Sequence, residues 1–481
     1  MLFTSVAYLI FLFSVLIAWY TTPVRYRWIV MLAANYFFYL TWVPAFVFVL
    51  FFSTGLSYVV ACQVASASEV SRKRWLRGGV MLLLSPLLLI KYYNFFNQNL
   101  NTLIEWAGLS NPLPFYSYLL PVGISFYTFQ TVSYVVDVYR GYIKPERHFG
   151  LFAVYVSFFP QLLAGPIERA RQLLPQLRQP KVRFNYTDAV GGLYLILWGC
   201  FKKIVLANRI QAFIAPVFQD PAHHYGLSVM LGCWLFSMQL FCDFSAYSDI
   251  AIGSARLFGI RLNANFADRV YASRSRTEFW RGWHMTLTAW FRDYVYAPLS
   301  KGVSNRRRLL FNLFIVYLLT GFWHGAEWGF LIWGALNGIW VIAEQVTKPA
   351  RQAFFERIGF GPEKLMHQWF SVGLVFTAGA LMGLWFRAET FADGKMLLMN
   401  LFAGGWQLTN VPNGSSMNKL LVIVLGLVAM DFVNRRMAGQ SIDVLLQRQS
   451  RLVQWAWVIG VAELILVLGK LDSLRFYYFQ F

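Results

Sequence analysis

The amino-acid sequence predicts an all-α polytopic membrane protein with about 10–12 transmembrane helices. Of its 481 residues, 58% are hydrophobic and only 13% are charged, whereas soluble domains carry about 25% charged residues. Apolar runs of roughly 18 residues or more, the length that an α-helix needs to cross a bilayer, recur along the whole chain. Short basic loops separate many of these runs, as is usual for helices that cross a membrane repeatedly.

The net charge of +20 is explained by the Lys and Arg residues of these short loops. This positive-inside pattern predicts the lipid bilayer, and not nucleic acid, as the partner of the basic residues. It also places the basic loops in the cytoplasm and the N-terminus outside. The cysteines have neither the spacing of a metal site nor that of a disulfide framework, so they are expected to pack between helices. They are Cys62, Cys200, Cys233 and Cys242.

Each apolar run is assigned to a span in chain order, and residues 1–481 are taken as one domain. The first run is expected to be a span and not a cleaved signal peptide, because it lacks a basic start. Residues 151–166 are apolar but lie between two basic loops and contain prolines and a glycine, which predicts a re-entrant segment whose backbone is satisfied by protein. The expected spans are residues 1–20, 28–43, 45–64, 79–95, 119–138, 186–218, 227–257, 309–346 (crossing twice), 368–386, 419–433 and 452–469.

The histidine of the motif FWHG, His324, interrupts the otherwise apolar run 309–346. It lies fifteen residues after the start of that run, so a helix would carry it roughly 22 Å into a hydrocarbon core of about 30 Å. An ionisable residue inside a membrane usually has a functional role. The alternative role for His324 is a structural hydrogen bond that holds two helices together. Desolvation would keep the ring neutral, as a general base requires. Nearby Gly321, Gly325 and Gly329 would let other segments approach it closely.

Residues 273–299 predict an amphipathic helix with His284 beside an aromatic face. Its aromatic side chains recur at spacings of three and four residues, which is the period of an α-helix. Arg281 and Arg292 are eleven residues apart and would share another face. An interfacial helix with its arginines on lipid phosphates explains most of this segment. It does not explain His284, which would suit the wall of a cavity.

Polar residues interrupt the apolar span 227–257. In lipid they are costly, so they are expected to face a water-filled cavity or an ionic partner such as Arg256. Three interpretations stay open: a proton or ion pathway, the polar wall of a substrate tunnel, and a buried structural ion pair. The residues are Asp243, Ser245, Tyr247, Ser248 and Asp249.

Four motifs, taken together and in this order, resemble the membrane-bound O-acyltransferase family. They are LPVGISFYTFQ, DFSAYSDIAIG, EFWRGWHMTLTAWFRDYVYAPL and GFWHGAEWGFLIWGALNG. The resemblance is greatest to the bacterial branch that includes membrane subunits of alginate O-acetylation and of teichoic acid D-alanylation. Two departures from the alginate-type pattern are visible: Gly282 replaces an arginine of FWRRWH, and YAPLSKGVSNRRR stands where YIPLGGNR is usual.

The resemblance implies a membrane O-acyltransferase, here an acetyltransferase, with a central tunnel among its helices. The donor would be cytoplasmic acetyl-CoA, which is a substrate and not a resident cofactor, and no metal is implied. The acetyl group would cross the bacterial inner membrane for O-acetylation of an extracytoplasmic polysaccharide such as alginate. A periplasmic acetyltransferase that modifies the polysaccharide would be the partner protein.

The resemblance also implies roles for individual residues. His324 matches the catalytic histidine of the family and His284 its second active-site histidine, within a catalytic core at about residues 119–346. Because guanidinium groups suit phosphate, arginines near the cytoplasmic face are expected to bind acetyl-CoA: Arg274, Arg276, Arg281 and Arg292. The substrate tunnel is expected to be lined by Asp243, Tyr247, Asp249, Trp280, Trp283, Trp323 and Asn337.

Two other functions stay open at this point. D-alanyl or other acyl transfer to teichoic acid or peptidoglycan would keep the fold and change the substrates. A proton-coupled transporter is the alternative of another class, because buried acids and histidines also form proton relays and broken segments such as 151–166 occur in transporters. The sequence shows no inverted repeat to support it.

Overall fold

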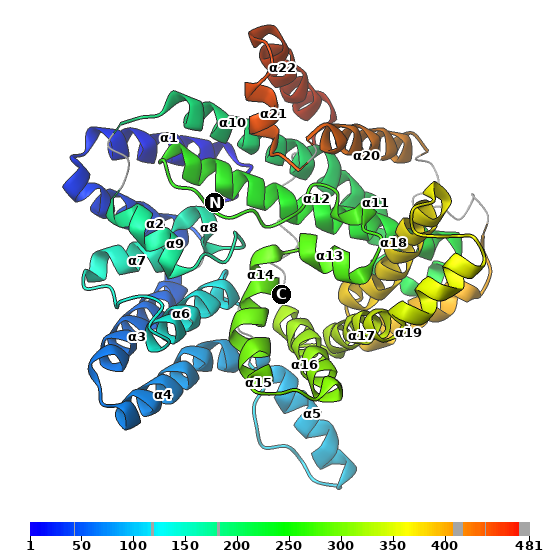
Figure 1. The fold of residues 1–481 in the computed structure, drawn as a ribbon, viewed down its shortest axis with the longest axis horizontal. Helices are drawn as coiled ribbons and strands as arrows, with labels where there is room; N and C mark the ends of the chain where they lie inside the picture. Colours follow the sequence, from blue (N-terminus) through cyan, green and yellow to red (C-terminus); the bar gives the residue numbers. More distant parts are fainter. Residues whose placement is uncertain (43, 117–119, 180–182, 407–416, 438, 471–481) are drawn as a thin grey trace. The chain divides into compact units, whose positions relative to one another are not determined.

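The computed structural model describes residues 1–481 except 43, 117–119, 180–182, 407–416, 438 and 471–481 (Figure 1). The described residues form α-helices joined by short 3₁₀ and π segments and by loops, and no strand occurs among them. They pack as two compact units. One comprises Met1–Leu193 and Ile250–Asn263, and the other comprises Tyr194–Asp249 and Ala264–Tyr477. The prediction of a single domain with a core at 119–346 stays a prediction.

The first unit holds the N-terminal helices. They are α1 (Val6–Thr21), α2 (Arg27–Leu40), α3 (Val47–Ser66), α4 (Glu69–Leu87), α5 (Tyr93–Trp106), α6 (Ile124–Tyr139), α7 (Phe149–Ser157), α8 (Phe159–Leu162), α9 (Ala170–Arg178) and the first half of α10 (Tyr186–Cys200). In this unit α3 packs on both α4 and α6, and α2 packs on α7.

The second unit holds the helices that carry the predicted site. After α10, a π-helical segment (Phe201–Ala207) leads into α11 (Asn208–Gln219). The others are α12 (Leu227–Leu257, which is shared with the first unit), α13 (Arg276–Gly282), α14 (Met285–Phe291), α15 (Ala297–Ser300), α16 (Arg306–His324), α17 (Trp328–Arg357), α18 (Leu365–Arg387), α19 (Phe391–Phe402), α20 (Met417–Met437), α21 (Ile442–Gln447) and α22 (Arg451–Leu468).

The predicted class, an all-α multi-pass membrane protein, is confirmed. In the described part of the chain, 7 helices are long and apolar enough to cross a membrane, and α1 is a shorter apolar helix. Some predicted spans form shorter helices, such as α2 with 14 residues and α6 with 16 residues. The long ones are Pro44–Ser66, Glu69–Trp106, Tyr186–Gln219, Leu227–Leu257, Trp328–Arg357, Leu365–Arg387 and Arg451–Leu468.

The segment predicted to be re-entrant, residues 151–166, is broken and buried. Its helix ends at Ser157 and a new one begins at Phe159. Asn35 of α2 serves the backbone at this break: its side-chain oxygen accepts from the amide of Phe159 at 3.0 Å, and its nitrogen donates to the carbonyl of Val154 at 3.4 Å. A buried break needs such partners because an unsatisfied backbone group in an apolar interior is costly. The re-entrant path itself stays a prediction.

The run 309–346 forms a helical hairpin, as predicted. Helix α16 ends at His324 and α17 begins at Trp328, and Figure 1 shows the two helices side by side. The glycines Gly321 and Gly334 face each other across the hairpin. Small residues at such a crossing let helix backbones approach closely, which is the usual packing of membrane helices. This close packing holds the end of α16, and with it His324, against α17.

We expect Gly321→Ala to lower the melting temperature of the purified protein in detergent. A β-carbon at position 321 would collide with the carbonyl oxygen of Phe330 and lie 3.0 Å from the Cα atom of Gly334, so the helices would have to separate. Overpacking of this kind costs about 1–3 kcal/mol. Gly373→Ala in α18 is the matched control, since a β-carbon there meets nothing within 4 Å. Equal melting temperatures for the two variants would contradict the prediction.

Candidate functional site

All of the predicted site residues lie in the second unit. Among them His324 is the last residue of α16 and is only 2% exposed. Its imidazole lies among three aromatic rings, with centroids 4.9 Å from Trp323, 5.3 Å from Trp333 and 5.1 Å from Phe386. The three rings come from α16, α17 and α18. The predicted burial of His324 is therefore confirmed, and its surroundings are aromatic.

The predicted continuous amphipathic helix at 273–299 is wrong. Helix α13 ends at Gly282 and α14 begins at Met285, so the chain breaks beside His284. His284 adopts a left-handed backbone with φ 43°, and among the described residues it is the one non-glycine with positive φ. Arg281 and Arg292 consequently lie on different helical segments and do not share one helix face. Left-handed backbone costs a non-glycine residue about 1–3 kcal/mol, so the surrounding structure must impose it.

Asn265, to which nothing in the sequence draws attention, holds the break in place. Its side-chain oxygen lies 3.0 Å from Nδ1 of His284 and accepts hydrogen bonds from the hydroxyl of Thr286 at 2.8 Å and its amide at 3.3 Å. Its carbonyl oxygen accepts from the amide of Met285 at 2.9 Å. Asn265 is buried. These bonds join the start of α14 to the loop that follows α12.

Burial lowers the pKa of His284 to about 3, because an apolar environment disfavours the charged ring. The ring of Phe244 stands edge-on to it at 4.7 Å, and Phe266 lies at 6.4 Å. His284 is therefore neutral at physiological pH. A neutral imidazole has one nitrogen that donates and one that accepts, as acid–base chemistry requires.

Trp323 joins the two histidines. Its indole centroid is 4.9 Å from the ring of His324 and 6.2 Å from the ring of His284. The fold thus brings together two buried histidines that are forty residues apart in the sequence. Trp283, next to His284 in the chain, packs on Phe266 at 5.1 Å.

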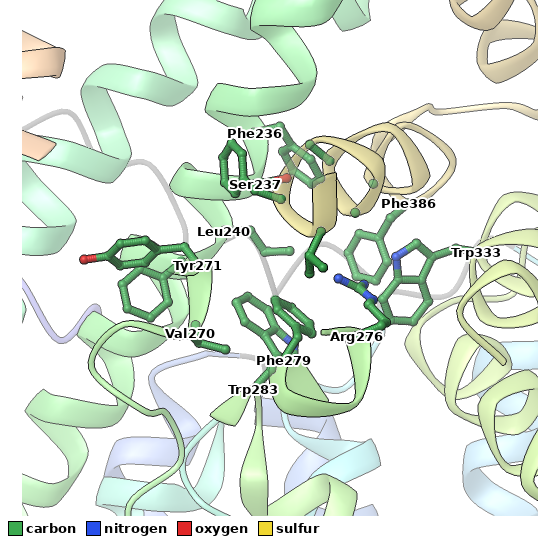
Figure 2. A pocket seen from close by; sticks show the side chains of 16 residues that line it. Phe236, Ser237, Leu240, Val270, Tyr271, Arg276, Phe279, Trp283, Trp333 and Phe386 are labelled. Atoms are coloured by element: carbon green, nitrogen blue, oxygen red, sulfur yellow. The ribbon is translucent and has the colours of Figure 1, made fainter. Parts of the chain in front are cut away.

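An apolar pocket, whose lining Figure 2 shows, lies next to aromatic residues that contact His324. Its cavity volume is about 70 Å³. Trp333 and Phe386, which contact His324, form part of its wall. Other wall residues are Phe236 and Leu240 of α12, Phe279 of α13, Val375 and Gly383 of α18, and Trp283, which follows α13. The pocket is one apolar space beside the histidines, and a central tunnel stays a prediction.

Arg276 brings a positive charge to this pocket. It is 4% exposed, and Figure 2 shows its guanidinium beside the indole of Trp333. Its Nε donates to the side-chain oxygen of Asn337 at 2.7 Å, and its backbone amide donates to Glu344 at 2.6 Å. Burial lowers the pKa of Arg276 to about 10, so it stays charged at neutral pH. Trp280 packs at 5.8 Å on Trp333.

The other three predicted donor-binding arginines, Arg274, Arg281 and Arg292, are exposed. Arg292 forms an ion pair of 2.8 Å with Asp293, and the backbone amide of Arg274 donates to Glu278 at 2.7 Å. The four arginines therefore do not share one environment, because Arg276 is buried beside the pocket. Their role in binding a donor stays a prediction.

The polar cluster of α12 faces the π-helical segment. Asp243 pairs with Lys203 at 2.6 Å, and both side chains are nearly completely buried. Asp249 pairs with Lys202 at 2.8 Å, and the ammonium of Lys202 also donates to the hydroxyl of Ser245 at 2.8 Å. Of the three interpretations, the buried ion pair is the one that this geometry supports directly. Tyr247, between the two acids, is buried.

An ionic partner such as Arg256 was one of the two surroundings expected for this cluster, and the ionic partners observed are lysines. Arg256 instead lies 3.7 Å from Asp188 of α10. The lysines at 202 and 203 occupy a π-helical segment, whose wider turn sets side chains in directions that a regular α-helical spacing does not predict.

Gly282, which replaces an arginine of the usual motif, is buried at the end of α13. A β-carbon there would lie 2.9 Å from the β-carbon of Ala267 and 3.3 Å from Val270. The loop after α12 thus packs directly on Gly282. The backbone carbonyl of Gly282 accepts a hydrogen bond from the amide of Ala267 in that loop at 2.8 Å.

The fold and this site define a multi-pass membrane protein with a buried pair of histidines beside an apolar pocket. Comparison with known proteins identifies the class more closely. Residues 146–359 match the membrane-bound O-acyltransferase family. The chain is 34% identical to a probable alginate O-acetylase AlgI of Azotobacter vinelandii over 437 residues, which is 88% of this chain and 83% of the relative. The chain therefore belongs to the membrane-bound O-acyltransferase family, and it is a membrane O-acyltransferase.

Two further relatives extend the range of acceptors within the family. A peptidoglycan O-acetyltransferase of Helicobacter pylori is 32% identical over 353 residues, covering 68% of this chain and 66% of the relative. A teichoic acid D-alanyltransferase of Bacillus subtilis is 28% identical over 245 residues, covering 49% of this chain and 62% of the relative. The matched part of the chain in the family comparison contains both His284 and His324.

Proposed function

We propose that this chain takes an acetyl group from cytoplasmic acetyl-CoA and moves it across the bacterial inner membrane for O-acetylation of an extracytoplasmic polysaccharide such as alginate. The observation that carries the proposal is the meeting of His284 and His324 at the indole of Trp323. The breadth of similarity supports the substrate class. The alginate O-acetylase relative aligns over 88% of this chain, against 49% for the D-alanyltransferase.

His324 is the proposed general base. The neutral ring takes the proton of an acceptor hydroxyl as that oxygen attacks the thioester carbon. The bond between that carbon and sulfur then breaks, and the ring passes the proton to the departing sulfur, so that coenzyme A leaves as a free thiol. A positioned base of this kind contributes about 10²–10⁴ in rate. His284 orients the hydroxyl or the base, and the hydroxyl of Tyr247 is a further candidate for steadying the developing oxyanion. The aromatic rings of Trp323, Trp333 and Phe386 keep water from the thioester, which limits its hydrolysis.

Labelled acetyl-CoA tests this function. The purified chain is reconstituted in vesicles with a periplasmic acetyltransferase from the same bacterium and with alginate oligosaccharides. We expect label to reach the oligosaccharide only when the chain, the donor and the partner are all present. Label from a D-alanyl carrier protein in place of acetyl-CoA would identify the D-alanyl reaction, and proton flux without any donor would identify a transporter. Either result would overturn the proposal.

The exposed arginines are proposed to bind the phosphates of acetyl-CoA. We expect the double variant Arg274→Gln/Arg281→Gln to raise KM for acetyl-CoA about three- to tenfold and to leave kcat nearly unchanged, because charge-assisted bonds to phosphate act in binding. The effect should shrink as ionic strength rises, since exposed charges are screened.

The matched control for this variant removes the same charge elsewhere. Arg74 and Arg77 of α4 are also exposed, so Arg74→Gln/Arg77→Gln lowers the net charge by the same amount. Its KM for acetyl-CoA should equal that of the wild type. If both double variants raise KM equally, the arginines act only through the overall field of the protein, and no specific phosphate contact exists.

A further inference from the structure

The orientation of the His284 ring is set by one side chain, Asn265. Three donors converge on the side-chain oxygen of Asn265: the amide of Thr286 at 3.3 Å, its hydroxyl at 2.8 Å and the Nδ1 atom of His284 at 3.0 Å. The side-chain nitrogen of Asn265 lies 3.4 Å from the hydroxyl of Ser248 on α12. Asn265 therefore ties α12 and α14 to the histidine between them.

Whether the oxygen or the nitrogen of the Asn265 side chain faces Nδ1 of His284 determines which ring nitrogen of His284 carries the hydrogen. A backbone amide can only donate, so the atom that faces the amide of Thr286 is the carbonyl oxygen of the Asn265 side chain and not its nitrogen. A carbonyl oxygen can only accept. Nδ1 of His284 must therefore carry the hydrogen, and in the neutral ring Nε2 is then the accepting nitrogen.

The backbone of His284 makes the same arrangement rigid. Its φ of 43° lies in the left-handed region, which a non-glycine residue adopts only when its surroundings impose it. The carbonyl of Asn265 accepts from the amide of Met285 at 2.9 Å, directly after the histidine. The side chain of Asn265 thus contacts the ring of His284, and the main chain of Asn265 contacts the backbone directly after His284.

We propose that Asn265 is a positioning residue of the active site, which fixes His284 in the Nδ1-protonated form so that Nε2 accepts a hydrogen bond from a second hydroxyl of the acceptor, next to the hydroxyl that is acetylated. This inference rests on the proposed function, since it assigns His284 its part in the same acyl transfer. It gives the two histidines different tasks. His284 accepts the hydrogen bond of this second hydroxyl and so aligns the acceptor, and His324 removes the proton of the hydroxyl that attacks the thioester.

The groups packed around His284 make the proposal testable by pH. The ring is surrounded by Phe244 of α12, Phe266 of the loop and Trp323 of α16. The acids of α12 form ion pairs with lysines, Asp243 with Lys203 and Asp249 with Lys202, and Arg281 of α13 is exposed. A carboxylate placed at position 265 would therefore be a strong new influence on the ring, and it would favour the protonated imidazole.

Two substitutions separate a positioning role from a structural one. Asn265→Ala should lower kcat for acetyl transfer about ten- to a hundredfold, as losing a residue that orients a functional histidine does, with little change in KM for acetyl-CoA. Asn265→Asp should partly restore kcat at high pH and shift the acidic limb of the rate profile to higher pH. Asn312→Ala is the control: Asn312 is equally buried in the same unit, binds the carbonyl of Leu299 and should leave the profile unchanged.

Nitrogen-15 spectra of the labelled protein provide a readout that does not depend on activity. The signal that disappears in His284→Ala identifies the ring of His284. In the wild type this signal should be that of an imidazole protonated on Nδ1. In Asn265→Ala it should be that of a mixture of the Nδ1-protonated and Nε2-protonated rings. An Nε2-protonated His284 in the wild type, or an Asn265→Ala variant with unchanged kcat and unchanged pH profile, would overturn the inference. Failure of the proposed function is distinguishable, because the wild type would then transfer no acetyl group while the spectra still report the ring.

Discussion

His324→Ala is expected to abolish acetyl transfer while the protein still inserts and folds. The ring is 2% exposed, at the end of the helix that carries it, and it is the proposed base for the acceptor hydroxyl. Without a positioned base the rate should fall by about 10²–10⁴. Transfer of labelled acetyl groups to the polysaccharide measures the loss. Size-exclusion chromatography and the melting temperature verify folding.

Two further variants test whether the loss of activity comes from the space that alanine leaves or from the removal of any histidine. Alanine leaves a space among Trp323, Trp333 and Phe386, so His324→Gln is made as well because it keeps most of the volume. His223→Ala is the matched control, since this histidine is exposed and lies 2.8 Å from Asp220. It should retain wild-type activity. Substantial transfer by folded His324→Ala and His324→Gln proteins would show that the ring is only a packing contact.

Lys203→Met is expected to be the most destabilising substitution that we predict. Lys203 and Asp243 form an ion pair of 2.6 Å with side chains 1% and 2% exposed. Removing one partner of a buried pair leaves a charge in an apolar interior and costs about 3–5 kcal/mol. We therefore expect a large fall in melting temperature and a loss of folded protein on extraction.

The double variant Lys203→Met/Asp243→Asn removes both charges and should recover most of this stability, because no isolated charge stays buried. The exposed pair of Lys73 and Glu69, at 3.3 Å with side chains 54% and 84% exposed, is the matched control. Lys73→Met should cost about 0–1 kcal/mol. Equal melting temperatures for Lys203→Met and Lys73→Met would contradict the prediction. A stable double variant without activity would instead favour a tunnel role for Asp243.

Several features were predictable from sequence because they follow from length and composition. Runs of apolar residues long enough to cross a bilayer predicted the helical membrane class, and basic residues at both ends of 309–346 predicted the hairpin that the structure contains. Four motifs in order, two of which contain His284 and His324, predicted the family. The depth of His324 in the membrane was predicted from its distance along a helix and stays a prediction, while its burial within the protein is observed.

Other features depend on contacts between distant parts of the chain. An α-helical period was visible at 273–299, yet the helix breaks at His284, where hydrogen bonds accepted by the oxygens of Asn265 hold a left-handed backbone. Arg256 was expected beside the acids of α12, but a π-helical turn presents Lys202 and Lys203 instead. Periodicity tells which face of a helix is apolar; it does not tell which side chain from another segment lies opposite.

The sequence by itself determined the class of this protein, the hairpin and the two histidines, because each depends on residue types within one continuous stretch. Only the tertiary structure decided that Trp323 joins the histidines, that Asn265 orients one of them, and that the acids of α12 are held by lysines. The physical reason is that hydrogen bonds and ring contacts act over a few ångströms. Apart from the adjacent Trp323 and His324, the partners lie 19 to 47 residues apart along the chain and meet only when the helices have packed.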